Sequence, residues 1–177
     1  MSGGPEAGAA LAALVHAGFG LKHTARAGWV RAGIDAPESV AAHSWGMSLL
    51  ALAACPPELD LARVLALCAV HDLPECEVGD ITPHDGVSPE EKRSRERQAA
   101  ARLFAAHPRL WGLWEEYEQQ RSPKARFVKA LDKADMGAQA QVYAQQRGAD
   151  TRPFVESALR GLPEGPLRDL ARGGRGA

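Results

Sequence analysis

The 177-residue sequence lacks the features that assign a chain to the secreted, membrane or nucleic-acid-binding classes. Its three cysteines, Cys55, Cys68 and Cys76, form no CxxC pair and are odd in number, which argues against a disulfide framework and a thiolate zinc site. Lys and Arg number 21 against 22 Asp and Glu, so no basic field attracts nucleic acid or an anionic membrane. The N-terminal region lacks the basic stretch of an export signal and has no apolar run of membrane-spanning length. We therefore expect a cytoplasmic protein that binds neither nucleic acid nor a membrane.

Strand signals are equally scarce, since no run of alternating β-branched residues occurs. A hydrophobic content of 45% and a charged content of 24% are typical of a globular domain. The sequence predicts an all-α fold, a compact bundle of about six helices in one domain over residues 9–160. Gly- and Pro-containing ends, residues 1–8 and 161–177, are predicted to be flexible tails.

Helix starts are marked by capping residues. Ser39, Asp60, Ser88 and Ser122 each precede an apolar or charged helical pattern and are suited to the N-cap position. The segment 20–38, rich in Gly and basic side chains, is predicted to be a loop. The predicted helices cover residues 9–19, 40–54, 61–73, 89–106, 123 to about 142, and 154–159.

Two histidines and two aspartates are distributed over three of these helices in a pattern that suggests a metal site. His43 is followed 28 residues later by His71-Asp72, and Asp132 comes 60 residues after Asp72. Singly, each has a simpler interpretation, such as a histidine bonded to a backbone carbonyl or a solvated Asp–Lys pair. Together they make a nitrogen and oxygen donor set for a divalent ion such as Mn, Co, Fe, Ni or Zn, which would also remove the repulsion between two buried carboxylates.

Six sequence segments, which occur in a fixed order over about residues 10–145, carry a resemblance to a known family. The chain resembles the HD-domain metal-dependent phosphohydrolases, and more narrowly the HD-domain 5′-deoxynucleotidases. The segments are LKHTARAGWVRAG, PESVAAHSWGM, HDLPECEVGDITP, EEKRSRE, LWEEYE and SPKARFVKALDKADM. The resemblance implies an HD-type helical bundle, a homodimer, and release of phosphate from deoxynucleoside 5′-monophosphates by a metal-activated water. It marks His43, His71, Asp72 and Asp132 as the metal ligands.

The resemblance also suggests roles for residues around the ligands. Glu75, one turn beyond Asp72, is marked as the catalytic acid/base. Arg26 is suited to binding phosphate, with a solvated loop arginine as the alternative. Trp29 would stack on the nucleoside or enclose it, or else cover the core. Asp80 would contact the sugar or help to hold a second ion such as Mg, or else only turn the chain after Gly79.

Two departures from the family pattern leave alternatives open. Ala42 stands where the family often has an acid, which removes half of a capping box but no ligand. His84 and His107 follow the His-Asp pair, as extra ligands do in the di-iron oxygenases of the wider family. One alternative is such an oxygenase. A second is an HD phosphohydrolase that acts on a nucleoside triphosphate, cyclic dinucleotide or guanosine alarmone. A third is a non-catalytic binding module in which the metal only stabilises the fold.

Overall fold

The computed structural model describes residues 5–174, and within that range the chain forms helices and no strand, so the predicted all-α class is confirmed. The helices are α1 (Pro5–Phe19), the 3-10 helix η1 (Gly20–Lys22), α2 (Ala27–Arg31), α3 (Val40–Ala54), α4 (Leu61–Val70), α5 (Glu75–Val78), α6 (Pro89–Leu103), α7 (Pro108–Gln119), α8 (Pro123–Arg147), α9 (Arg152–Gly161) and α10 (Pro166–Arg172).

The four predicted N-caps are present and fix where the longer helices begin. The side chains of Ser39, Asp60, Ser88 and Ser122 each accept a hydrogen bond from the backbone N–H three residues further on. Each bond satisfies a donor that the first turn of a helix leaves free. The starts of α3, α4, α6 and α8 therefore follow directly from local sequence, and with them the position of each side chain along its helix.

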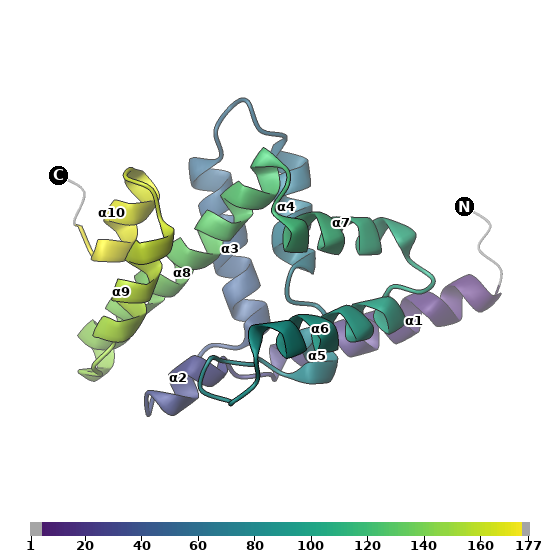
Figure 1. Ribbon diagram of the computed structural model, residues 1–177, viewed down its shortest axis with the longest axis horizontal. Coiled ribbons are helices and arrows are strands. Elements are labelled where there is room, and N and C mark those ends of the chain that lie inside the picture. The colour runs from purple at the N-terminus through teal and green to yellow at the C-terminus, as the bar shows by residue number, and fades with distance from the viewer. Residues whose placement is uncertain (1–4, 175–177) are drawn as a thin grey trace.

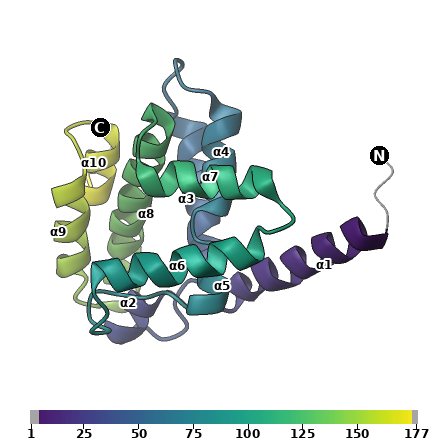
Figure 2. The ribbon, with the colours of Figure 1, turned by 45° about the vertical axis from the view of Figure 1, so that its right-hand side comes forward.

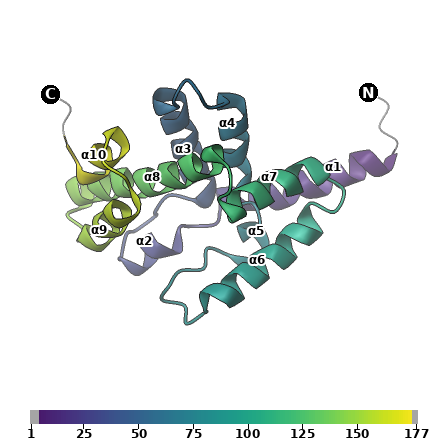
Figure 3. The ribbon, with the colours of Figure 1, turned by 45° about the horizontal axis from the view of Figure 1, so that its top comes forward.

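The long helix α8 runs through the middle of the fold, with α9 and α10 on one side and α3, α4 and α7 on the other (Figures 1 and 2). The largest buried cluster joins α3, α4, α7 and α8 and includes Met47, Leu67, Trp114 and Leu131. Figure 3 shows α1 extending away from this bundle, on the side opposite to α10. The apolar side chains of Val128 and Leu131 on α8 face this core, where both are fully buried.

The prediction of about six helices is too low, since residues 5–174 contain ten α-helices and a 3-10 helix. The segment 20–38, predicted as a loop, holds η1 and α2. Its Gly and basic residues favour a loop locally, but Trp29 and Ile34 are buried against Tyr143 of α8. Tertiary packing therefore imposes a short helix that the local sequence does not indicate.

The predicted tails also differ from the structure. Residues 1–4 and 175–177 lie outside the described residues. The described part of the segment 161–177 forms α10, in which Ala171 is fully buried against α8 and α9. This segment therefore contributes to the core. Among the described helices, none combines the length and apolarity needed to cross a membrane.

Candidate metal centre and adjoining cavity

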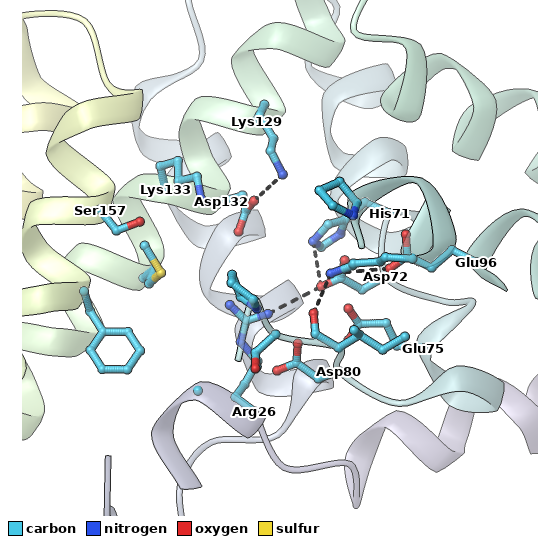
Figure 4. Close-up of a pocket in the computed structure, with 18 of the residues that line it drawn as sticks. Arg26, His71, Asp72, Glu75, Asp80, Glu96, Lys129, Asp132, Lys133 and Ser157 are labelled. Atoms are coloured by element: carbon cyan, nitrogen blue, oxygen red, sulfur yellow. Dashed lines mark hydrogen bonds and ion pairs between the residues drawn. The ribbon is translucent and has the colours of Figure 1, made fainter. Parts of the chain in front are cut away.

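Three of the predicted ligands, His43, His71 and Asp72, form one close group, and Asp132 lies beside it. His43 lies in the first turns of α3, His71 and Asp72 follow the end of α4, and Asp132 lies on α8. His71 Nε2 is 3.0 Å from Asp72 Oδ2, and His43 Nε2 is 3.8 Å from the same oxygen. Asp132 joins through His43, whose Nε2 is 3.4 Å from Asp132 Oδ1. Figure 4 shows His71, Asp72 and Asp132 facing one another across a small gap.

The two imidazoles are oriented as metal ligands usually are. Among the described residues, His43 Nε2 and His71 Nε2 are buried and make no hydrogen bond. Their other ring nitrogens are bonded, since His71 Nδ1 donates to the Cys68 carbonyl at 2.9 Å and His43 Nδ1 lies 2.6 Å from Asp135 Oδ2. A proton held at Nδ1 leaves the Nε2 lone pair free to bind an ion. Two buried, unsatisfied nitrogens beside carboxylates therefore fit a divalent metal ion.

Asp135 is a functional residue that the sequence interpretation missed. It lies one turn beyond Asp132 on α8, and its carboxylate approaches α3 so closely that a Cβ at Gly46 would overlap it. Gly46 thus leaves the space that the His43–Asp135 contact requires. The spacing in LDKAD places both acids on one helix face, and that spacing was the available signal.

Charges around the centre keep its carboxylates ionised. Burial raises the pKa of Asp72, but the neighbouring His71, His43 and Arg26 outweigh burial and hold that pKa well below its usual range. The pKa of Asp132 is likewise low despite burial, because Lys129 Nζ lies 2.9 Å from its Oδ2 and His43 is adjacent.

His43 itself is basic in this setting. Burial and the charge of Arg26 lower its pKa, but the adjacent carboxylates of Asp132 and Asp135 outweigh them and raise that pKa to about 9. A metal ion binding at His43 Nε2 therefore competes with a proton at neutral pH.

Glu75 lies directly beside this centre, at the start of the short helix α5. Its backbone N–H donates to the Asp72 carbonyl at 3.0 Å, and its side chain is only 5% exposed. Its Oε2 makes no hydrogen bond with any described residue. Burial, together with the charges of Asp72 and Asp80, raises the pKa of Glu75 well above its usual value. A carboxylate with a raised pKa takes up a proton more readily than an exposed one, as a group that serves in proton transfer must.

Arg26 and Asp80 also line the cavity beside the centre. The Arg26 guanidinium is 3.7 Å from Asp72 Oδ2 and largely buried. Asp80 Oδ2 accepts the backbone N–H of Ala27 at 2.8 Å, which ties the loop after α5 to the start of α2. Because Ala27 follows Arg26 in the chain, this hydrogen bond helps to position Arg26. The sequence did not indicate the Asp80–Ala27 contact.

Trp29 is buried, so its ring is not placed to contact a substrate. It is only 2% exposed, it donates from Nε1 to Glu38 Oε1 at 2.9 Å, and its ring packs on Tyr143 and Phe154. It contributes to one wall of the adjoining cavity but belongs mainly to the core. This position agrees with the alternative that Trp29 covers the core.

The extra histidines do not form a second histidine-ligated centre within residues 5–174. His107 Nε2 lies 3.3 Å from the Ala10 carbonyl, near the N-terminal helix. His84 lines the cavity, yet neither histidine belongs to a group of three potential ligands in the described chain. The arrangement therefore gives no support to a di-iron oxygenase.

A cavity of about 1020 Å³ opens beside the ligands. Arg26, Asp72, Glu75, Asp80 and Lys92 line one part of it, and side chains from α8 and α9 line the opposite part. Figure 4 shows Ser157 and Lys133 across from Glu75 and Glu96. The cavity is at the upper end of volumes typical for small-molecule sites, so a nucleotide-sized ligand can reach the centre.

The helical fold and the buried histidine and aspartate set define a metal-binding helical domain with an adjoining cavity. A family model described as "HD domain" matches residues 20–163, so the chain belongs to the HD-domain family. This membership confirms the resemblance found in the sequence.

Similar proteins carry names that specify an activity. The 5′-deoxynucleotidase HDDC2 of Danio rerio is 38% identical over 173 residues, which cover 87% of this chain and 86% of the relative. The human 5′-deoxynucleotidase HDDC2 is 41% identical over 128 residues, 70% of this chain but only 63% of the relative.

Solved structures agree on the fold. The PH0347 protein of Pyrococcus horikoshii superposes with a TM-score of 0.74 at 27% identity and covers 90% of this chain and 93% of its own. A structure described as a predicted metal-dependent phosphohydrolase from Magnetospirillum magnetotacticum gives a TM-score of 0.68 at 28% identity, covering 93% of this chain and 89% of its own.

Proposed function

We propose that this protein is a metal-dependent 5′-deoxynucleotidase, which hydrolyses (deoxy)nucleoside 5′-monophosphates to nucleoside and phosphate. HD-domain membership and the names of its relatives support this class of reaction. The observation that carries the proposal is Glu75, whose buried carboxylate has an oxygen unbonded to any described residue beside the ligand Asp72. A purely structural metal site needs no such group.

His43, His71, Asp72 and Asp132 would hold one divalent ion, such as Mn, Co, Fe, Ni or Zn. When bound, that ion supplies Lewis-acid chemistry, which acidifies water and offsets charge on the phosphate. We further propose that a second, weaker ion such as Mg binds near Glu75 and Asp80.

Glu75 handles the proton in this scheme. It accepts a proton from the attacking water as the new oxygen–phosphorus bond forms. It then returns that proton to the nucleoside 5′-oxygen as the phosphorus–oxygen bond breaks. Burial and the neighbouring charges of Asp72 and Asp80 raise the pKa of Glu75, which makes its carboxylate a better proton acceptor than an exposed one.

Arg26 would bind the phosphate. Its guanidinium lies beside the ligand Asp72 and lines the cavity, so phosphate oxygens near the ion come within reach of its paired donors. Lys92, which donates from Nζ to the Ile81 carbonyl at 2.8 Å, adds positive charge to the same part of the cavity.

Phosphate release from purified protein tests the proposal. The panel holds deoxy- and ribonucleoside 5′-monophosphates and a triphosphate, with Mn, Co and Mg supplied in turn. The variants are Glu75→Gln and the matched control Glu77→Gln, an exposed residue of the same helix that pairs with Arg102. We expect monophosphates to be cleaved, deoxy faster than ribo, and Glu75→Gln to keep its metal content and lose turnover.

Other outcomes separate the alternatives. Faster cleavage of the triphosphate would favour another HD phosphohydrolase. Absence of phosphate release with every ion, together with bound metal, would favour the metal-stapled module. Oxygen consumption by a paired iron centre would favour the oxygenase.

We propose a homodimer, to be tested by light scattering, and a cytoplasmic location, with which the three free cysteines are compatible.

A further inference from the structure

Charged and apolar side chains are unevenly distributed along the cavity beside the metal centre. The end near the ligands carries the charged side chains of Arg26, Asp72 and Glu75. The part of the cavity that α8 and α9 line includes the apolar side chains of Met136 and Phe154. A ligand with a charged group at one end and a flat apolar group at the other matches this division.

We propose that Phe154 forms the subsite on which the base of the nucleotide stacks. This proposal rests on the proposed function and adds the group that holds the other end of that substrate. It also replaces Trp29 in the stacking role that the sequence suggested.

The ring of Phe154 packs on Trp29 on one side and lines the cavity on the other. It packs on Trp29 with ring centroids 4.1 Å apart at an interplanar angle of 35°. Trp29 is only 2% exposed, whereas Phe154 is half-buried and lines the cavity. The aromatic surface available to a ligand therefore belongs mainly to Phe154, and Trp29 holds that ring in place.

The subsite and the proposed phosphate contact are linked through α2. A Cβ at Gly28 would lie 3.1 Å from Phe154 Cε1, so the ring rests directly against α2. Gly28 is two residues from Arg26, whose guanidinium approaches the ligand Asp72. Phe154 and Arg26 are thus connected through one short helix, as the two ends of a single nucleotide require.

Stacking recognises the face of a base and not its hydrogen-bonding edge. Every purine and pyrimidine has such a face, so an aromatic platform tolerates all of them. Lys133 and Ser157 lie on the same side of the cavity and add donors, but neither forms a rigid pattern complementary to one base. We therefore expect the subsite to distinguish a nucleotide from a bare sugar phosphate, without selecting strongly among bases.

The test compares dTMP and dAMP with 2-deoxyribose 5-phosphate, which has the same phosphoester and no base. The measured quantity is the ratio of kcat/KM for each nucleotide to that for the sugar phosphate. In the unmodified protein we expect a ratio of about tenfold or more. Phe154→Ala should bring the ratio close to one for both bases, mainly through KM.

Phe154→Leu guards against a folding defect, because leucine retains apolar packing on Trp29 and lacks the aromatic face. It should also lower the ratio. Glu156→Ala is the matched control, an exposed residue of α9 outside this cavity, and should leave the ratio unchanged.

Equal cleavage of nucleotides and sugar phosphate by the unmodified protein would overturn the subsite. So would an unchanged ratio in both Phe154 variants, or a loss confined to one base. If no phosphate is released from any of the three compounds, that result contradicts the proposed function and, with it, the proposed subsite.

Discussion

The Asp135 carboxylate holds His43 in place, with Oδ2 of the acid 2.6 Å from Nδ1 of the imidazole. His43 is fully buried, and its Nε2 faces the Asp72 and Asp132 carboxylates on the other side of the ring. The contact therefore sets both the direction of the ring and the nitrogen that is available to an ion.

Asp135→Asn should weaken metal binding by roughly tenfold to hundredfold, because the amide cannot supply the charge that fixes the His43 proton. Isothermal titration with Mn or Co measures the effect. Gly46→Ala should give a similar loss, since its Cβ would displace the same carboxylate. Asp169→Asn, an exposed acid on α10, serves as the control. Unchanged affinity in both site variants would contradict the role given to Asp135.

Metal affinity should depend on pH through His43. Its pKa is raised to about 9, so below that pH an incoming ion must displace a proton, and above it the nitrogen is already free. The apparent affinity should therefore fall as the pH is lowered from 9 to 7, by about tenfold per pH unit. The pKa values of Asp72 and Asp132 are low, so these acids add no protons in this range.

Competition with a metallochromic chelator at several pH values, corrected for the chelator's own titration, measures this dependence. An affinity independent of pH between 7 and 9 would show that His43 is not protonated before the ion binds.

Metal addition should stabilise the fold. At a free ion concentration of about 100 times Kd the stabilisation is about 2.7 kcal/mol, provided that the ion binds only the folded chain. For a chain of this size that corresponds to a rise in Tm of roughly 5–10 °C. Asp72→Asn should remove most of the rise, because the ligand next to both histidines loses its charge. Thermal melts with and without EDTA test this, and a full rise in the variant would exclude Asp72 as a ligand.

Gly137→Ala should destabilise the packing of α10 on α8. A Cβ at Gly137 would overlap Ala171 and closely approach Ala158, so the C-terminal helices would have to shift. We expect a loss of about 1–3 kcal/mol in the free energy of unfolding, measured in urea. Gly112→Ala in α7 is the matched control, since nothing lies within 4 Å of its Cβ, and it should be neutral or stabilising by about 0.5–1 kcal/mol. Equal effects of the two changes would mean that α10 contributes little to the core.

Local sequence was sufficient for the parts of the fold that depend on capping. Ser39, Asp60, Ser88 and Ser122 were each identified as caps, because a short polar side chain before a helical pattern satisfies a free N–H within the same turn. The short helices α2 and α10 could not be found in this way. Their existence depends on burial against α8, which involves residues far along the chain.

For the proposed metal centre, the sequence by itself supplied the candidate donors: two histidines and two aspartates on three helical segments, with Glu75 one turn beyond the His-Asp pair. Only the tertiary structure decided how those donors are supported, because contacts such as Asp135 with His43 and Asp80 with Ala27 join residues 92 and 53 positions apart. It also decided that Trp29 lies in the core while Phe154 faces the cavity. Residue type specifies what a side chain can bind, whereas the packing of α2, α8 and α9 determines which surface remains open to bind it.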